Sequence, residues 1–391
     1  MMTQENILIV DDEPFNVDYL EQELQESGYA TLSAFSGSEA LEIIAKESPA
    51  LVLLDIMMPG MDGFEVLRRL KGQEATRDLP VIIISADSNL KSVVQGIQLG
   101  AEDYLPKPFE PTLLHARISS SLEKKRLRDI EQLYLKGLER ELDIGRQIQQ
   151  GFLPELIPAI DGWDVATYFK AAREVAGDYY DAFTLPDGRL VCLVGDVCGK
   201  GVGAALFMSL FRSLIRVLAT SGETFTNRVA QNLTAHEYLS RLVSFTNQYV
   251  CDIHGDSGLF TTLFICLLEP DGGKLTYLNA GNEPPFWLSK NQLITELRPT
   301  GPVIGIIPEA VFSTKEIVLQ SGDILCAFTD GITDALDAED VIFGRKRLLE
   351  TLQVSPSEPG MMIETVVKEL GYFTGSTAQF DDITLLVVKK S

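Results

Sequence analysis

Histidine and cysteine are scarce in this chain of 391 residues, and their spacing excludes several kinds of site. The three histidines and five cysteines form no Cys-x-x-Cys pair and no pattern with the spacing of zinc ligands. All five cysteines lie in the C-terminal part, and we expect them to be reduced thiols in the core of a cytoplasmic protein. The residues concerned are His115, His236, His254, Cys192, Cys198, Cys251, Cys266 and Cys326.

Positive charge is also scarce, because 33 Lys and Arg against 56 Asp and Glu give a net charge of −23. So acidic a chain repels nucleic acid and anionic membranes, and we expect neither as a partner. The first residues lack the basic segment and apolar run of a signal peptide. The most apolar helix candidate, Val202–Ala219, is interrupted by Arg212 and Arg216, which predicts a buried core helix rather than a membrane span.

The first third of the chain alternates short apolar runs with segments of helical periodicity. A chain of this length is expected to form about two or three domains. Continuous runs of Val, Ile and Leu predict strands buried on both faces, as in a parallel sheet between two helix layers. The predicted strands are Ile7–Val10, Tyr29–Ala34, Ala50–Ile56, Pro80–Ser85 and Asp103–Leu105, and the predicted helices are Asn16–Ser27, Ser38–Lys46, Asp62–Lys71 and Asn89–Leu99, with a fifth from Pro111.

Polar side chains follow four of these predicted strands. They are Asp11 and Asp12, Asp55, Ser85, and Lys107. Functional groups of such sheets collect beyond the carboxyl ends of the strands. Three carboxylates that meet there repel one another unless a hard cation such as Mg²⁺ lies among them. Lys107 and Ser85 add a cation and a hydroxyl donor for phosphate oxygens, so the pattern predicts a phosphoryl-acceptor site with Asp55 as nucleophile.

Residues 5–123 resemble a response-regulator receiver domain. The resemblance rests on Asp11-Asp12, Asp55-Ile-Met-Met-Pro-Gly-Met-Asp-Gly, Ser85-Ala and Lys107-Pro-Phe. It implies a doubly wound fold with a five-stranded parallel sheet, in which Asp55 accepts a phosphoryl group from a histidine kinase or phosphotransfer protein. It also implies a cis peptide before Pro108. The implied Mg²⁺ ligands are Asp12, Asp55 and the Met57 carbonyl, assisted by Asp11, and the implied switch residues are Ser85, Tyr104 and Lys107.

A long helical connector is expected to follow. Apolar residues recur at spacings of three and four as far as Phe152, which predicts an amphipathic helix that can form a coiled coil. Gly137, Gly145 and Gly151 each weaken it by about 1 kcal/mol relative to alanine, so we expect it to bend or melt near the second domain. Residues 141–154 resemble the linker before RsbU-type phosphatases. We favour a dimerising, signal-transmitting helix over a passive spacer. The expected domains are 1–123, the linker 124–153 and 154–391.

From Trp163 onward the pattern changes to hairpin-connected strands mixed with helices. Pro186-Asp187-Gly188 predicts a turn between strands Tyr179–Leu185 and Arg189–Val194. The whole pattern indicates an α/β sandwich of antiparallel sheets. Further strands are expected at Thr261–Leu268, Lys274–Leu278, Pro285–Leu288, Glu316–Leu319, Ile324–Phe328 and Ile383–Val388, and helices near Gly203–Leu218, Glu237–Val250, Arg345–Leu352 and Met361–Gly371.

Four aspartates of this part stand beside glycines or at the edges of apolar runs. They occur in Gly177-Asp178, Gly195-Asp196-Val-Cys-Gly-Lys-Gly, Thr329-Asp330-Gly331 and Asp381-Asp382. Ligation by carboxylates alone favours Mg²⁺ or Mn²⁺ over zinc or copper. Two such ions about 3.5–4 Å apart can activate water and orient a phosphate ester, so no histidine, cysteine or serine nucleophile is required.

Residues 150–390 resemble the metal-dependent (PPM, or type 2C) serine/threonine protein phosphatases, in particular their SpoIIE/RsbU branch. The four aspartate motifs carry the resemblance, together with Asn279-Ala-Gly-Asn-Glu-Pro-Pro and Pro302-Val-Ile-Gly. The chain departs from the branch at Asn282, where a histidine is usual, and at Ala176, where a glycine is common. The resemblance implies one metal held by Asp196, Asp330 and Asp381, a second held by Asp178, Asp196 and the Val197 carbonyl, Asp382 as a neighbour, and Arg173 as a phosphate-binding residue.

The two halves together predict a phosphatase under the control of Asp55 phosphorylation. The resemblance implies a phosphorylated anti-sigma-factor antagonist as substrate and two Mn²⁺ or Mg²⁺ ions as cofactors. The alternative is a non-catalytic adaptor that binds a regulatory protein through its phosphatase-like domain. The presence of all four aspartates favours the enzyme.

Overall fold

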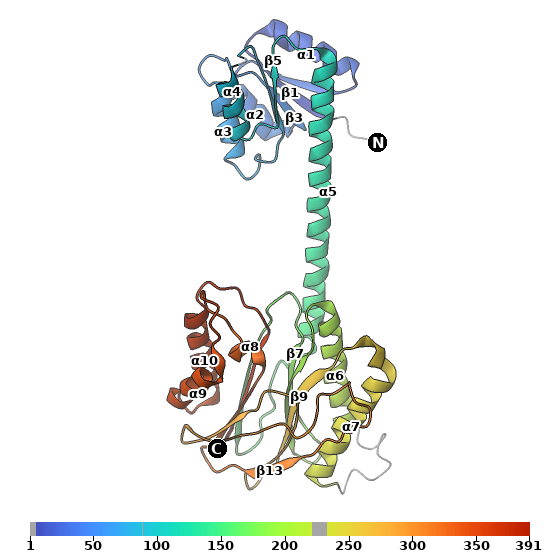
Figure 1. Cartoon of the computed structure of the whole chain (residues 1–391), viewed down its shortest axis with the longest axis vertical. Helices are drawn as coiled ribbons and strands as arrows, with labels where there is room; N and C mark the ends of the chain where they lie inside the picture. The colour runs from blue at the N-terminus through green and yellow to red at the C-terminus, as the bar shows by residue number, and fades with distance from the viewer. Residues whose placement is uncertain (1–4, 88, 221–232) are drawn as a thin grey trace. The chain divides into compact units, whose positions relative to one another are not determined.

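The computed structural model describes residues 5–87, 89–220 and 233–391. Residues 1–4, where the sequence predicts no signal peptide, lie outside the described residues. The chain divides into two compact units, Met1–Leu138 and Glu139–Ser391. The division falls inside one long helix, α5, within the predicted linker (Figure 1).

The first unit contains a five-stranded parallel sheet in the order β2-β1-β3-β4-β5. Alternate residues of β1 enter two cores, because Leu8 and Val10 pack with α2 and α3, whereas Ile7 and Ile9 pack with α1 and α5. The predicted doubly wound fold is therefore confirmed. The elements are β1 (Asn6–Val10), α1 (Pro14–Glu26), β2 (Ala30–Ala34), α2 (Gly37–Glu47), β3 (Leu51–Leu54), α3 (Gly63–Lys71), β4 (Val81–Ser85), α4 (Leu90–Gln98), β5 (Asp103–Pro106) and α5 (Pro111–Gln150).

Helix α3 begins directly against the end of β3. Asp62 caps the helix by accepting a hydrogen bond from the Glu65 amide, as N-cap aspartates commonly do. A Cβ on Gly63 would lie 2.2 Å from the Asp55 carbonyl oxygen, so only glycine fits at the first position of α3. The Asp-Gly pair of the receiver motif thus fixes the backbone around Asp55.

Helix α5 is continuous over its 40 residues and runs through Gly137 and Gly145 without a break. It ends at Gln150, next to Gly151, the third glycine predicted to weaken it. Its first turns are buried in the receiver core, and ion pairs such as Arg117–Asp103, at 2.8 Å, hold it there. Beyond the receiver its apolar side chains are exposed, including Ile130 at 63% and Tyr134 at 66%.

The second unit contains two five-stranded sheets in which every pairing is antiparallel, in the orders β13-β10-β9-β8-β7 and β12-β11-β14-β15-β6. The predicted sandwich of antiparallel sheets is confirmed. The strands are β6 (Trp163–Lys170), β7 (Asp178–Thr184), β8 (Leu190–Val197), β9 (Thr261–Leu268), β10 (Lys274–Ala280), β11 (Phe286–Ser289), β12 (Gln292–Glu296), β13 (Lys315–Val318), β14 (Ile324–Phe328) and β15 (Ile383–Lys390). The helices are α6 (Val202–Thr220), α7 (Ala235–His254), α8 (Asp330–Thr333), α9 (Gly344–Val354) and α10 (Pro359–Thr374), with a 3₁₀ turn at Gly255–Ser257.

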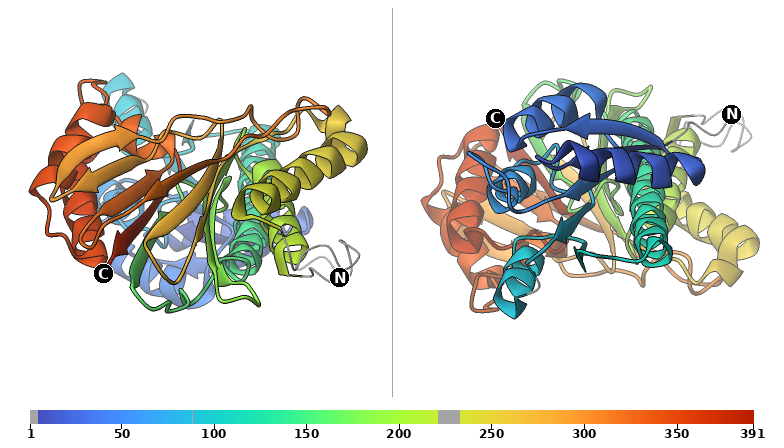
Figure 2. Two further views of the ribbon diagram at one scale, coloured as in Figure 1. Left: turned by 90° about the horizontal axis from the view of Figure 1, so that it is seen from below. Right: turned by 90° about the horizontal axis from the view of Figure 1, so that it is seen from above.

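Three hydrophobic cores separate four layers in this unit. One core joins α6 and α7 to the first sheet, the second lies between the two sheets, and the third joins the second sheet to α9 and α10. Figures 1 and 2 show the two helix pairs on opposite outer faces of the sandwich. The four predicted aspartates lie at or near the ends of strands from both sheets: Asp178 at the start of β7, Asp196 near the end of β8, Asp330 after β14 and Asp381 before β15.

Strands β6 and β12 and helix α8 were not among the elements predicted from the sequence. Strand β12 is mostly exposed and polar, and it pairs with β11 across a tight turn in which Lys290 and Asn291 have φ of 49° and 59°. Helix α8 has four residues and is too short for a periodic pattern.

Helix α6 is, among the described residues, the one helix long and apolar enough to cross a membrane by length and composition. In the structure Met208, Phe211 and Ile215 pack in the core against the first sheet, as the sequence predicts. Its two arginines, Arg212 and Arg216, lie 2.8 Å from the buried carboxylate of Asp181 on β7.

Candidate functional site

The first candidate site lies beyond the carboxyl ends of β1, β3 and β5, as predicted. Lys107 Nζ lies 2.6 Å from Asp11 Oδ2 and 2.8 Å from Asp55 Oδ1. Asp11 and Asp55 are both buried, whereas Asp12 is half-buried. Burial raises the pKa of Asp55, and the ion pair with Lys107 opposes that shift. Burial also lowers the pKa of Lys107, but its hydrogen bonds to the two carboxylates outweigh burial and raise the pKa overall.

The predicted switch residues Ser85 and Tyr104 lie on β4 and β5, and Lys107 follows β5. Ser85 is fully buried, and its hydroxyl accepts a hydrogen bond from the Asp87 amide at 3.3 Å. The Tyr104 hydroxyl donates to the Asp87 carbonyl. The Met57 amide donates to Asp55 Oδ2 at 2.6 Å, and the Lys107-Pro108 peptide is cis, as predicted.

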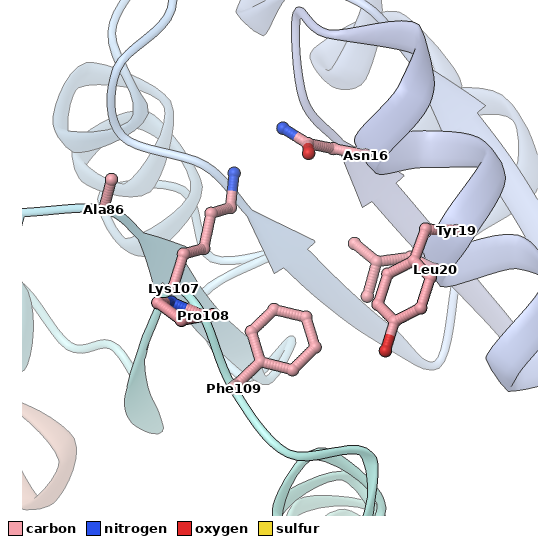
Figure 3. Close-up of a pocket in the computed structure, with 7 residues that line it drawn as sticks. All are labelled: Asn16, Tyr19, Leu20, Ala86, Lys107, Pro108 and Phe109. Carbon is pink, nitrogen blue, oxygen red and sulfur yellow. The ribbon is translucent and has the colours of Figure 1, made fainter.

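A pocket of about 460 Å³ opens beside Lys107, and sequence reasoning missed it. Figure 3 shows the polar ends of Lys107 and Asn16 on its two sides. Asn16 Nδ2 donates to Asp11 Oδ1 at 3.0 Å, so the pocket leads to the acceptor site. Its lining residues are Asn16, Tyr19, Leu20, Ala86, Lys107, Pro108 and Phe109.

The second candidate site gathers the four predicted aspartates at one end of the sandwich. Asp178 and Asp196 face each other as a cross-strand pair of β7 and β8. Asp330 begins α8 just after β14, and Asp381 precedes β15. A Cβ on Gly331 would lie 1.9 Å from the Asp382 carbonyl oxygen, so the Asp-Gly and Asp-Asp motifs touch through their backbones.

The carboxyl groups of this site are close enough to shift one another's pKa. Burial, followed by the charges of Asp330 and Asp381, raises the pKa of Asp196 to about 7. Burial and Asp381 raise the pKa of Asp330 to about 6. Burial, then the charge of Asp196, raises the pKa of Asp178, which is 2% exposed. Such a set of oxygen donors, with Asp178 buried and Asp196, Asp330 and Asp381 half-buried, fits a hard divalent cation, which would relieve their repulsion.

The predicted ligands are neighbours, but their side chains are farther apart than the ligands of a bound metal ion. Across residues 5–87, 89–220 and 233–391, no three His, Cys, Asp or Glu side chains stand at metal-ligand spacing. The Val197 carbonyl, the predicted backbone ligand, faces Gly177, where a Cβ would lie 2.9 Å from its oxygen. A side chain at position 177 would therefore press against that carbonyl.

Two threonines that the sequence analysis did not single out hold Asp178. Its Oδ2 accepts hydrogen bonds from Thr329 Oγ1 at 2.7 Å and from Thr384 Oγ1 at 2.6 Å. Both threonines belong to the aspartate motifs Thr-Asp-Gly and Asp-Asp-Ile-Thr, and this position in the sequence is the signal that could have identified them. These bonds leave Oδ1 as the oxygen free of both threonines.

Asp382, which the sequence left without a ligand role, organises the loop before β7. Its carboxylate accepts from the amides of Ala172 at 2.8 Å and Gly177 at 2.7 Å. Arg173 lies in this loop and is exposed, and its side chain forms no ion pair with any residue the structure describes. The predicted phosphate-binding role of Arg173 stays a prediction.

The two departures from the family pattern are accommodated by hydrogen bonds. Asn282 is buried, and its Nδ2 donates to the Phe328 carbonyl at 3.2 Å, just before the Thr329-Asp330 motif. The backbone of Ala176 is held by the side chain of Gln149, from the last turn of α5. Both loops therefore keep a defined geometry without the usual residues.

Comparison with known proteins decides the family. Residues 186–391, more than half of the chain, match the family Stage II sporulation protein E (SpoIIE). The chain belongs to the SpoIIE family. Residues 7–119 match the response regulator receiver domain. This SpoIIE-family chain thus joins an N-terminal receiver domain to a C-terminal phosphatase domain of the SpoIIE, PP2C-like type, as the motifs predicted.

Two relatives are similar to this chain in sequence, and one solved structure is similar to it in fold. Protein IcfG of Synechocystis is 40% identical over 269 residues, which cover 65% of this chain and 42% of IcfG. Response regulator PleD of Caulobacter vibrioides is 44% identical over 114 residues, 29% of this chain and 25% of PleD. The chain therefore spans less than half of either relative. The SiaA-PP2C domain of Pseudomonas aeruginosa shares the fold, with a TM-score of 0.56 at 22% identity over 66% of this chain and 99% of that domain.

Proposed function

We propose that this SpoIIE-family chain is a two-component response regulator in which phosphorylation of Asp55 controls a metal-dependent serine/threonine protein phosphatase. The observation that carries the proposal is the cluster of buried and half-buried carboxyl groups of Asp178, Asp196 and Asp330, whose pKa values are raised by burial and mutual repulsion. Perturbed titratable groups of this kind are typical of functional sites. We further propose that the protein acts in the cytoplasm.

The receiver half has the parts needed to accept a phosphoryl group. Asp55 is the nucleophile, and its oxygen forms the new bond to phosphorus as the donor's bond to phosphorus breaks. Lys107, 2.8 Å from Asp55, is placed to neutralise the added charge. Asp12, Asp55 and the Met57 carbonyl, with Asp11, would hold Mg²⁺. The pocket beside Lys107 suits a histidine kinase or phosphotransfer protein that presents its phosphohistidine there.

The phosphatase half would hold two Mg²⁺ or Mn²⁺ ions through Asp178, Asp196, Asp330, Asp381 and the Val197 carbonyl. Bound there, the ions would activate water and bind the phosphate oxygens of a phosphoserine or phosphothreonine. Thr329 and Thr384 orient Asp178, and Asp382 fixes the loop that carries it. Hydrolysis breaks the bond from phosphorus to the ester oxygen, which leaves as the serine or threonine hydroxyl after taking a proton.

The substrate we propose is a phosphorylated anti-sigma-factor antagonist. Membership of the SpoIIE family and the resemblance of the linker to that of RsbU-type phosphatases support this choice. A phosphoprotein can also reach the site from the side of Asp381, whose side chain is 32% exposed.

We propose that α5 carries the signal and pairs with a second copy. Exposed apolar side chains along its middle, including Ile130 and Tyr134, are suited to a coiled coil. At its end, Gln149 bonds the loop that leads to Asp178. A change in the pairing of α5 would therefore move Gln149, and with it the loop that positions Asp178. Replacing Ile130 and Tyr134 with glutamate should convert a dimer to a monomer in light scattering.

The test is hydrolysis of a phosphorylated antagonist by the purified chain with Mn²⁺, with and without a phosphoryl-mimicking beryllium fluoride complex. We expect turnover that depends on the mimic, is lost in Asp196→Ala, and loses its response to the mimic in Asp55→Ala. Asp187→Ala, in an exposed turn, is the matched control. If the chain hydrolyses no substrate either with or without the mimic, the proposed phosphatase activity is refuted.

A non-catalytic adaptor is the second candidate. The observation in its favour is that no group of three or more His, Cys, Asp or Glu side chains among the described residues stands at metal-ligand spacing. An adaptor would capture the antagonist equally well in a chelator and in Mn²⁺, whereas the proposed enzyme requires the metal.

A further inference from the structure

Lys200 lies in the loop between β8 and α6, and its ammonium group is held at the edge of the carboxylate site. Its Nζ lies 2.9 Å from Asp381 Oδ2 and 2.8 Å from the Phe380 carbonyl oxygen. It also lies 3.7 Å from the centroid of the Phe380 ring, a distance typical of a cation–π contact. Two consecutive residues before β15 therefore hold this cation.

The backbone of the loop directs Lys200 toward β15. Gly199 and Gly201 on either side have φ of 100° and 80°, a conformation that favours glycine. No heavy atom lies within 4 Å of a Cβ built on Gly201, so the backbone angle and not space requires glycine there. The two glycines allow a sharp turn before α6 with the lysine at its tip.

The charge of Lys200 opposes that of the aspartates. Among the described residues, it is the one lysine or arginine side chain that pairs with any of Asp178, Asp196, Asp330 and Asp381. Its positive charge also lowers the pKa of Asp330, against the larger effects that raise it. The side chain is 30% exposed, so it can leave Asp381 for the solvent side of the site.

We propose that Lys200 exchanges one binding partner for another when a divalent cation and the substrate bind. It pairs with Asp381 while the carboxylates hold no divalent cation, and it binds an oxygen of the substrate's phosphoryl group once a cation takes over Asp381. The two cations compete for the same carboxylate and repel each other, which frees the ammonium. A lysine ammonium on its flexible stem suits a phosphate oxygen. This inference rests on the proposed phosphatase function, because it requires that Asp381 bind a metal.

Metal binding gives a readout that does not depend on turnover. Mn²⁺ is titrated into the full chain by calorimetry, in an Asp55→Ala background that weakens the proposed receiver site. Lys200→Met should bind Mn²⁺ about two- to fivefold more tightly, since no partly exposed ion pair has to be broken. Lys200→Arg should bind like the parent chain. Lys346→Met, which removes the same charge from an exposed position on α9, should leave the affinity unchanged.

The second readout is phosphate recognition. Lys200→Met should raise both the KM for a phosphoserine peptide and the inhibition constant of inorganic phosphate about tenfold, the effect of losing a charged hydrogen bond, with a smaller change in kcat. Lys200→Arg should restore both values, and Lys346→Met should not change them. A thermal melt of each variant confirms that it is folded.

The outcomes separate the inference from the proposed function. If the parent chain binds Mn²⁺ and hydrolyses the peptide but Lys200→Met leaves phosphate inhibition unchanged or weakens Mn²⁺ binding, the exchange is overturned and the phosphatase stands. If the parent chain does neither, both proposals are refuted.

Discussion

The side-chain amide of Gln149 forms hydrogen bonds with both backbone polar groups of Ala176. Gln149 Nε2 donates to the Ala176 carbonyl at 2.7 Å, and Gln149 Oε1 accepts from the Ala176 amide at 2.9 Å. Gln149 and Ala176 are both buried. Since Ala176 precedes Asp178 by two residues, the end of α5 is fastened to the loop of a proposed metal ligand.

Gln149→Ala should therefore loosen this loop. It leaves a buried amide and a buried carbonyl without a partner, at a cost of about 1–3 kcal/mol for an unsatisfied group. We expect a lower free energy of unfolding of the second unit in urea, and weaker Mn²⁺ binding in calorimetry. Gln150→Ala, at the exposed neighbouring position, is the control. Equal effects of the two substitutions would argue against the coupling.

Raising the pH should destabilise the metal-free chain. The pKa values of about 7 for Asp196 and about 6 for Asp330 exceed their ordinary value of 3.8, so the folded state retains protons that the unfolded state has lost. Stability falls with rising pH wherever the folded state binds more protons, here between about pH 4 and pH 7.

The pH dependence can be measured by urea unfolding in a chelator at several pH values. Asp196→Asn should flatten the slope, because the amide does not titrate. Mn²⁺ should reverse the slope, since it binds the deprotonated carboxylates. A metal-free chain whose stability rises as steeply in the parent as in Asp196→Asn contradicts the assigned shift.

Lys107→Met should make the receiver depend on Mg²⁺ for its stability. The substitution leaves the buried carboxylates of Asp11 and Asp55 without their shared cation, at a cost of about 3 kcal/mol. Millimolar Mg²⁺ should restore much of the loss by taking over the charge. The measurement is the melting temperature with and without Mg²⁺, and Lys91→Met, on the exposed face of α4, is the control. A loss that Mg²⁺ does not reduce would count against the proposed receiver metal site.

Asp181→Ala should weaken the attachment of α6 to β7. Asp181 is fully buried, and its carboxylate pairs with Arg212 and Arg216, each at 2.8 Å. Removing it leaves two cations against the core and should lower the free energy of unfolding by about 3 kcal/mol. Asp187→Ala removes an exposed partner of Arg189 and should cost under about 1 kcal/mol. If the two substitutions lower the free energy of unfolding in urea by similar amounts, the stabilising role of buried Asp181 is refuted.

The sequence predicts the receiver more completely than the phosphatase domain. In a parallel sheet the end of each strand fixes where its next side chain lies, so Asp11, Asp55 and Lys107 could be brought together from strand ends alone. In the antiparallel sandwich, motif order identified Asp178 and Asp196 as candidate ligands, but it did not predict that they are cross-strand partners, which the structure shows. Glycines within the motifs carried further information, because Gly63 and Gly331 lie against the backbone of Asp55 and Asp382.

The contacts that support the aspartates were beyond local reasoning. Thr384 bonds Asp178 across 206 residues, and Asp382 bonds the Gly177 amide across 205. Such pairs depend on how the two sheets stack, which hydrophobic periodicity does not encode. The same holds for Gln149, whose polar side chain looks like part of an exposed helix face until its partner loop is known.

Strand β15 lies between β14 and β6, although it is the last strand in the chain. During synthesis, β6 is made early, and its pairing partner β15 is complete only after residues 383–390 have been synthesised. Deletion of residues 383–390 would remove β15 and leave β14 and β6 with unpaired strand edges, which promote aggregation. It would also remove Thr384 from Asp178. Deletion of residues 383–390 should therefore yield insoluble protein, whereas a small loss of stability would leave the protein soluble.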